Sequence, residues 1–247
     1  MGGGCFAGMS RGQRRGRRRG LSKGGGGIII VGTIMRVYFV MLAASICLEA
    51  VAFCGGSVEG TITLDSMRPQ PVSPGYKPQT VKPIQDTEPP VAIVYLEGPG
   101  AARATRKAQA VRIRQKGYQF RPSILAVQAG TTVEFPNEDD EFHNVFSYSK
   151  TKRFDLGRYR KDELAKQAVF DKPGLAKIYC EIHQHMRCLV LVVDTPLFTT
   201  TDTAGRFQLK DVPAGDYTMK VLMPSEKIVE SKITVKDGQT LRVQPQP

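Results

Sequence analysis

The chain has 247 residues, 41% of them hydrophobic, and a formal net charge of +12 at pH 7. This length allows one or two domains with their own hydrophobic cores, so disulfide bonds are not needed for stability. The charge does not indicate nucleic-acid binding, because residues 1–56 carry eight Lys or Arg and one Glu, a net +7, which leaves +5 for all the others. The arginine run in that stretch lacks the interleaved aromatic side chains that stack on bases.

Residues 1–56 predict an export signal with an extended basic N-terminus. A basic run at 11–23 is followed by an apolar stretch at 28–53 that ends with the small residues 50–52. This order of basic start, apolar middle and small-residue end is typical of a secretory signal. We therefore expect a periplasmic or extracellular protein.

Two features of this segment leave alternatives open. Arg36 follows Met35, so translation starting at Met35 would leave a compact signal with residues 37–48 as its apolar core. An uncleaved signal would anchor the protein in the membrane, although the apolar stretch is slightly short of the roughly 20 residues that a spanning helix needs. A lipid anchor on Cys54 is a third possibility. The sequence predicts membrane association only through such an anchor.

From residue 57 onward the pattern predicts an all-β protein. Short β-branched runs are bounded by Gly, Pro, Asn and Asp, and long helical periodicity is absent from the sequence. Strands are expected at residues 58–64, 91–96, 124–127, 131–135, 175–179, 189–193, 206–209, 217–222, 228–235 and 240–244. Only residues 162–169 resemble a short helix. Seven of the sixteen prolines fall within 69–90, which predicts a linker or extended loop because proline lacks the backbone donor.

The residues with the most distinctive chemistry gather near the end of this β region. The chain has three histidines, His143, His183 and His185, and two of them follow Cys180 closely, with Met186 next in the sequence. A soft thiolate, imidazoles and a thioether are ligands that suit copper. A short loop can supply several of them, whereas His143 must come from elsewhere in the fold.

Other metals fit this pattern less well. Zinc also binds Cys and His, but methionine is not one of its usual ligands. The acidic run at 138–141 could suggest calcium, yet it lacks alternating ligands and a glycine turn, so we expect a solvated loop. A lone Cys-x-x-His motif is weak by itself. The strand pair expected within residues 120–137 strengthens it, because that pair leads directly to His143.

Residues 111–194 resemble the cupredoxins, and the spacing of the last three candidate ligands is similar to that of the amicyanin and methylamine-utilisation branch. The resemblance implies a Greek-key β-sandwich that holds one copper ion cycling between Cu(I) and Cu(II). The implied ligands are His143, Cys180, His183 and Met186. Asn144 would support the ligand loop and donate a hydrogen bond to the cysteine sulfur.

The chain departs from this family at several positions. Gln184 stands where the family commonly has a proline, so the loop should be less rigid. His185 is a rival of Met186, and we expect it to be exposed and not to bind the metal. Cys188 is expected to be a buried small apolar residue. A disulfide between Cys180 and Cys188 in the metal-free protein remains open, because exported proteins meet an oxidising environment.

The flanking segments are similar to a different family. The similarity to carboxypeptidase regulatory-like domains, which have a transthyretin-like or carbohydrate-binding-like sandwich, is carried by residues 58–64, 91–98, 201–207 and 212–218. It implies one discontinuous β-sandwich made of residues 57–104 and 195–247, with the cupredoxin domain, 105–194, inserted into it. The shared motifs consist of residues that form turns, so a structural role is expected. Sugar binding would be suggested only by analogy with the fold.

These features together predict a one-electron carrier and not an enzyme. The sequence contains no recognisable nucleophile triad, paired catalytic carboxylates or phosphate-binding loop. The expected partner is a redox protein such as a c-type cytochrome, guided toward the acidic run at 138–141 if the partner is basic. A copper-delivery protein, or an envelope structural or adhesion protein with a vestigial cupredoxin domain, remains the alternative.

Overall fold

The computed structural model describes residues 55–66, 88–104 and 111–245. They belong to one compact unit, and strands make up their regular structure apart from the 3-10 helix η1 (Pro99–Arg103). The predicted all-β fold class is confirmed. Nearly all of the expected export signal and of the proline-rich linker lies outside the described residues. Within the described ranges we find no helix with the length and apolar character that crossing a membrane requires.

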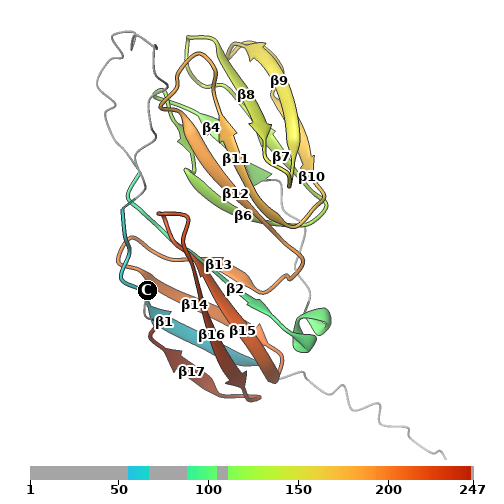
Figure 1. Cartoon of the computed structure of the whole chain (residues 1–247), viewed down its shortest axis with the longest axis vertical. Helices are drawn as coiled ribbons and strands as arrows, with labels where there is room; N and C mark the ends of the chain where they lie inside the picture. The colour runs from blue at the N-terminus through green and yellow to red at the C-terminus, as the bar shows by residue number, and fades with distance from the viewer. Residues whose placement is uncertain (1–54, 67–87, 105–110, 246–247) are drawn as a thin grey trace, which may run out of the picture. The chain divides into compact units, whose positions relative to one another are not determined.

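The first sandwich is built from two main sheets (Figure 1). The larger sheet has five strands in the order β6 (Ile124–Gln128), β12 (Arg187–Val193), β11 (Gly174–Tyr179), β8 (His143–Tyr148) and β9 (Arg153–Tyr159). The smaller sheet has the order β10 (Lys166–Phe170), β7 (Thr131–Phe135) and β3 (Val111–Arg112). A short ribbon of β4 (Arg114–Gln115) and β5 (Phe120–Arg121) accompanies them.

Alternating apolar residues on both sheets fill the core of this sandwich. On β7, Val133 and Phe135 are buried while Thr132 is exposed and Glu134 is half-buried, as expected when successive side chains point to opposite faces. Phe170 and Tyr159 are also fully buried in this core. Cys180, Met186 and Cys188 belong to the same cluster of buried residues. The core therefore extends to the loop that carries the candidate ligands.

The predicted short helix at residues 162–169 is wrong. Strand β10 occupies the second half of this segment and pairs antiparallel with β7, from Lys166 opposite Phe135 to Phe170 opposite Thr131. Ala168 and Phe170 are buried and Val169 between them is exposed, which is the two-residue period of a strand. The local helical propensity is overridden by this pairing and by the burial of Phe170.

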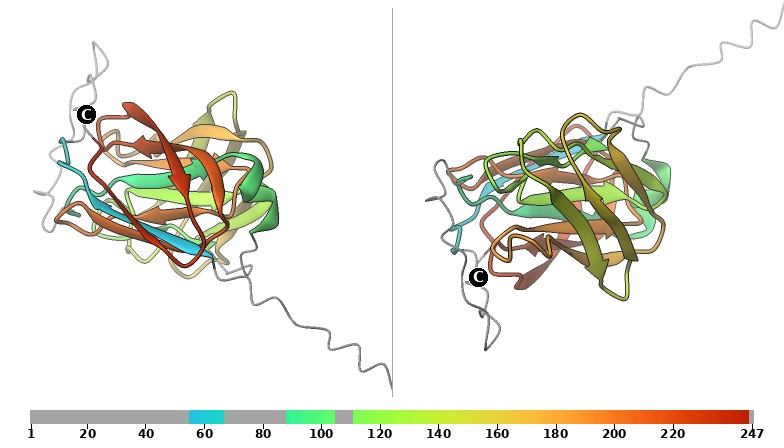
Figure 2. Two further views of the ribbon diagram at one scale, coloured as in Figure 1. Left: turned by 90° about the horizontal axis from the view of Figure 1, so that it is seen from below. Right: turned by 90° about the horizontal axis from the view of Figure 1, so that it is seen from above.

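The second sandwich also has two sheets. One has the order β14 (Arg206–Val212), β1 (Gly56–Thr61) and β17 (Thr240–Val243), and the other has β13 (Phe198–Thr200), β2 (Ile93–Glu97), β15 (Gly215–Leu222) and β16 (Ile228–Val235). In Figure 2, β1 is the blue strand among the orange and red strands from the C-terminal part of the chain. Strands from before and after the first sandwich thus pair with each other, β1 with β14 and β2 with β15.

The first strand ends earlier than predicted, next to a close approach of two backbone segments. Strand β1 ends at Thr61, and beyond it Ile62 donates its N–H to the carbonyl of Gly205 at 2.9 Å. Gly205 has a φ of +77°, and a Cβ there would lie 1.9 Å from the Ile62 carbonyl oxygen. Only glycine fits this turn, which holds the end of the strand against the segment leading into β14.

Strand β12 is buried on both faces. One face contributes Cys188, Val190 and Val192 to the core of the first sandwich. The other face of β12 contributes to a second cluster of buried apolar residues, which come from β2, β6, β12, β13 and β15. Ile93 and Leu222 in this cluster are fully buried. A strand that is buried on both faces reads as a continuous apolar run, as residues 188–193 do.

Candidate metal centre

The candidate ligands lie where two neighbouring strands of the large sheet end. His143 is the first residue of β8, and Cys180 directly follows β11. These strands pair antiparallel, with Tyr179 opposite Phe146, so the start of one lies near the end of the other. His183 and Met186 belong to the turn between β11 and β12. The sheet thereby gathers residues that are about 40 positions apart in the sequence.

The donor atoms of three of these residues converge. The Nδ1 atoms of His143 and His183 are 3.0 Å apart, and the Cys180 sulfur is 3.9 Å from the His183 Nδ1. The three side chains place their donor atoms within 4.8 Å of one another. Metal bonds to nitrogen and sulfur are about 2.0 and 2.3 Å long, so donors of one ion are at most about 4.3 Å apart. These residues can share one ion with only small movements.

Burial prepares these groups for metal binding. His143 has an exposed fraction of 0% and Cys180 of 3%, whereas His183 is partly exposed. Burial lowers the pKa of His143. The pKa of His183 is lowered to about 4, mainly by burial and to a lesser extent by repulsion from the positive charge that His143 or His185 carries when protonated. Both imidazoles are therefore neutral at pH 7. Metal ligands must be deprotonated, so no proton has to be removed from them at this pH.

The backbone of Met186 closes the ligand loop, residues 180–186, through two hydrogen bonds. Its backbone N–H donates to the His183 carbonyl at 2.8 Å, and its own carbonyl accepts from the Cys180 N–H at 3.3 Å. Its side chain is 1% exposed within the same core cluster as Cys180. These two hydrogen bonds hold the loop closed although it has Gln184, and no proline, near its centre. The role of Met186 as the axial ligand stays a prediction.

His185 differs from the expectation of an exposed side chain. It is partly buried, and its Nε2–H donates to the Tyr118 carbonyl at 3.0 Å. It does not belong to the cluster formed by the other two histidines and Cys180. Tyr118 is 67 positions away in the sequence. The sequence around His185 therefore carries no signal of this contact.

Asn144 supports the ligand loop as predicted, but through a different bond. Its side-chain oxygen accepts from the Glu181 N–H at 2.8 Å, directly after Cys180. Its Nδ2 donates to Asp155 at 3.0 Å and not to the cysteine sulfur. Asp155 lies on β9 opposite Phe146, and a carboxylate acceptor makes a stronger hydrogen bond than a neutral one.

Both described cysteines are free thiols. Cys180 and Cys188 are buried and do not form the disulfide that the sequence left open. Cys188 faces Ile178 on the neighbouring strand, and burial raises the pKa of its thiol well above the ordinary value. The prediction of Cys188 as a buried apolar residue is confirmed, and Cys180 remains available as a thiolate ligand.

The acidic run at 138–141 is exposed at Glu138, Asp140 and Glu141, as expected of a solvated loop, but not at Asp139. Asp139 has a side-chain exposure of 12%, and its Oδ2 is 2.9 Å from the Nε2 of His143. Glu138 forms ion pairs with Arg114 and Lys116, and Asp140 forms one with Lys161. The spacing of four residues between Asp139 and His143 is a sequence signal of this contact.

Tyr118 also contacts the candidate ligands, although the sequence offers no reason to expect this. Its ring meets the His183 ring edge to face at a centroid distance of 5.0 Å and the His143 ring at 5.9 Å. Tyr118 lies in the turn between β4 and β5, which sequence analysis did not identify as strands. No periodicity marks such a short ribbon, so its contact with the histidines follows only from the folded chain.

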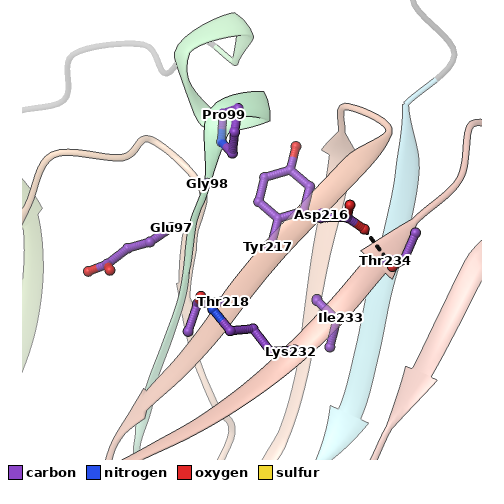
Figure 3. A pocket seen from close by; sticks show the side chains of 9 residues that line it. All are labelled: Glu97, Gly98, Pro99, Asp216, Tyr217, Thr218, Lys232, Ile233 and Thr234. Carbon is purple, nitrogen blue, oxygen red and sulfur yellow. Dashed lines mark hydrogen bonds between the residues drawn. The ribbon is translucent and has the colours of Figure 1, made fainter.

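A pocket on the second sandwich offers less chemistry (Figure 3). Its volume is about 410 Å³, and it is lined by Glu97, Gly98, Pro99, Asp216, Tyr217, Thr218, Lys232, Ile233 and Thr234. Its polar groups bind each other: the Thr234 hydroxyl donates to Asp216 at 2.6 Å, and the Lys232 ammonium donates to Thr218 at 2.6 Å. We therefore place the functional site at the histidine and cysteine cluster.

No protein-family model and no curated protein matches the sequence. Several solved structures are similar to a part of this chain. A copper-containing nitrite reductase from Thermus scotoductus is 26% identical with a TM-score of 0.33, over 38% of this chain and 26% of that one. The chain thus spans about a quarter of the length of that enzyme.

Two smaller proteins match as well. A purple cupredoxin from Nitrosopumilus maritimus is 25% identical with a TM-score of 0.30, over 34% of this chain and 99% of that one. An oxidised point mutant of amicyanin is 24% identical with a TM-score of 0.32, over 34% of this chain and 82% of that one. Each is a protein to which well under half of this chain is similar.

Proposed function

We propose that this protein is an exported type 1 copper protein that acts as a one-electron carrier. In this proposal His143, Cys180, His183 and Met186 hold one copper ion. The observation that carries it is the convergence of a buried thiol and two neutral imidazoles, with donor atoms within 4.8 Å of one another. When bound, copper supplies the exchange of one electron between Cu(I) and Cu(II).

The donor set favours copper over zinc. A cysteine and two histidines would suit either metal, but the loop closed by the Met186 backbone brings a thioether into the same buried cluster. A trigonal Cys and two-His set with a weak axial Met is typical of blue-copper electron-transfer sites. The three side chains place their donor atoms close together, and this preorganisation favours small structural changes when copper exchanges an electron.

The burial of the donors favours electron transfer over substrate conversion. His143 and Cys180 are buried, and His183 is the partly exposed member of the cluster. We propose that electrons pass through the edge of the His183 ring to a redox partner such as a c-type cytochrome in the periplasm. Because Glu138 and Asp140 are already ion-paired, the acidic run should attract a basic partner only weakly.

We assign a structural role to the second sandwich. Its resemblance to carboxypeptidase regulatory-like domains is supported by the pairing of β1 with β14 and of β2 with β15, which joins the segments that flank the first sandwich. The polar side chains of its pocket hydrogen-bond to each other, which does not favour sugar binding.

Voltammetry of the purified, copper-loaded protein tests the carrier role. We expect one reversible one-electron wave, with the copper retained through repeated cycles. A copper-delivery protein would instead release the ion in one of its two oxidation states. Irreversible reduction with loss of copper would therefore exclude the carrier and leave delivery as the function.

A further inference from the structure

Asp139 is the polar contact of His143 on the side opposite the proposed metal. The His143 ring uses one nitrogen, Nδ1, to face His183, and the other, Nε2, lies 2.9 Å from the Asp139 Oδ2. An ionised carboxylate can only accept hydrogen bonds, so the Nε2 of His143 must carry the proton. The lone pair of the neutral ring is then on Nδ1, which faces the other donors. Asp139 thus selects the tautomer that can bind a metal.

The same carboxylate also holds the turn that covers the histidines. Its two oxygens accept from the backbone N–H groups of Gly117, at 2.7 Å, and Tyr118, at 3.0 Å. Both residues have positive φ angles, 63° and 59°. A positive φ is costly for a bulky residue such as tyrosine, and it persists only where the surroundings enforce it.

The covering turn contacts the ligand loop as well. The Tyr118 ring packs edge to face on His183, and its carbonyl accepts from the Nε2–H of His185. One side chain, Asp139, is therefore connected to a ligand on β8 directly and to the ligand loop through Tyr118. Asp139 therefore does more than make a single hydrogen bond to His143, because it also fixes the position of the Tyr118 turn that packs on the histidines.

We propose that Asp139 is a positioning residue of the copper centre, which holds the Nδ1-binding tautomer of His143 and pins the Tyr118 turn over both histidine ligands. This inference rests on the proposed copper site and extends it to a residue outside the ligand set. A carboxylate on the far nitrogen of a ligating histidine fixes the ring and raises its basicity. The more basic ring favours the more highly charged Cu(II), so Asp139 lowers the reduction potential.

Asp139→Asn tests this role, with Asp140→Asn as the matched control. Both variants remove one negative charge from the same loop, but Asp140 is exposed and pairs with Lys161, not with a histidine. Loss of a residue that supports a metal ligand typically weakens metal binding about 10- to 100-fold. If Asp139→Asn weakens Cu(II) tenfold relative to Cu(I), the potential rises by about 59 mV. Asp140→Asn should shift it by less than a third of that.

A second measurement reads the tautomer without copper. Nitrogen-15 NMR of the metal-free protein should find the proton on Nε2 of His143 in the wild type and in Asp140→Asn, and a mixture of tautomers in Asp139→Asn. This measurement separates the proposed copper function from the proposed role of Asp139. If the wild type binds no copper, the proposed function fails, while the tautomer result still decides the role of Asp139. Circular dichroism confirms that each variant is folded.

Two results would overturn the inference. Equal potential shifts in the two Asn variants would mean that only the local charge acts, and an unchanged tautomer in Asp139→Asn would mean that another group orients His143. Should Asp139→Asn fail to fold, Asp139→Glu replaces it. That variant keeps the charge and displaces the carboxylate, so a potential and tautomer identical to the wild type would contradict the positioning role.

Discussion

At the residue scale, Met186 and His185 compete for the place of the fourth ligand. Met186 is buried in the cluster that contains Cys180, whereas the Nε2 of His185 is occupied by the Tyr118 carbonyl. An axial thioether is a weak, long ligand that tunes the potential more than it determines the colour. The two residues should therefore respond differently to truncation.

We expect Met186→Ala to keep the visible colour and shift the reduction potential, and His185→Ala to leave both nearly unchanged. Removing the buried Met186 side chain should also lower the free energy of unfolding by about 2 to 5 kcal/mol, because it leaves a cavity. Visible spectra, voltammetry and denaturant titration of both variants measure these effects. If His185→Ala bleaches the protein while Met186→Ala changes neither spectrum nor potential, His185 replaces Met186 in the ligand set.

The sequence identifies some residues of the site and not others, for a physical reason. Cys180, His183 and Met186 are close in sequence, and their chemistry together with the upstream strand pair expected within residues 120–137 makes them recognisable. Tyr118 and Asp139 act through contacts between a short turn and a loop, which leave no periodic pattern. The tautomer of His143 depends on this contact and cannot be read from its immediate neighbours.

At the element scale, Asn144 joins β8 to the ligand loop. Asn144→Ala removes two hydrogen bonds, those with the Glu181 N–H and with Asp155, and should lower the free energy of unfolding by about 1 to 3 kcal/mol. The loosened loop should also release copper faster. Denaturant titration and transfer of copper to a chelator measure the two effects.

Asp155→Asn is the control for this variant. It alters the β9 partner of the Asn144 Nδ2 but leaves the bond to the Glu181 N–H in place. Copper release should therefore stay close to the wild-type rate. Equal acceleration in both variants would show that the contact between β8 and β9, and not the loop bond, retains the metal.

The strands show which elements a sequence can predict. The 131–135 and 217–222 segments alternate clearly and were predicted almost to the residue, as β7 and as part of β15. The two-residue strands β3, β4 and β5 were missed, and β10 was mistaken for a helix. The pairing of β3 and β10 comes from the distant strand β7, whereas β4 and β5 pair with each other across a short turn. Short strands carry too few residues for a period to appear.

At the scale of the whole molecule, the second sandwich depends on segments from both ends of the described chain. A chain that ends at residue 194 lacks β14, β15 and β17, which flank β1 and β2. Buried residues of that core, such as Val58 and Leu96, would then be exposed on unpaired strands. Such edges promote association between chains, so we expect oligomers or aggregates in size-exclusion chromatography.

A chain that ends at residue 236 is the control, because it removes only β17 and leaves β1 paired with β14. It should elute like the full-length protein. If the chain ending at 194 is instead a stable monomer, the two flanking segments do not form one sandwich in solution. The resemblance carried by the turn motifs implied a sandwich shared by the two flanking segments, whereas the sequence did not predict that β1 pairs with β14 and β2 with β15, since strand order is not encoded locally.

The most direct test of the copper site is a titration of the purified protein with Cu(II), followed by visible absorption, beside the same titration of Cys180→Ser. Copper bound to a thiolate in a trigonal site gives an intense charge-transfer colour that nitrogen and oxygen ligands alone do not. We predict that this colour reaches its limit at one copper per chain in the wild type and is absent in Cys180→Ser. A wild type that stays colourless, or a Cys180→Ser protein with the same band, would contradict the account.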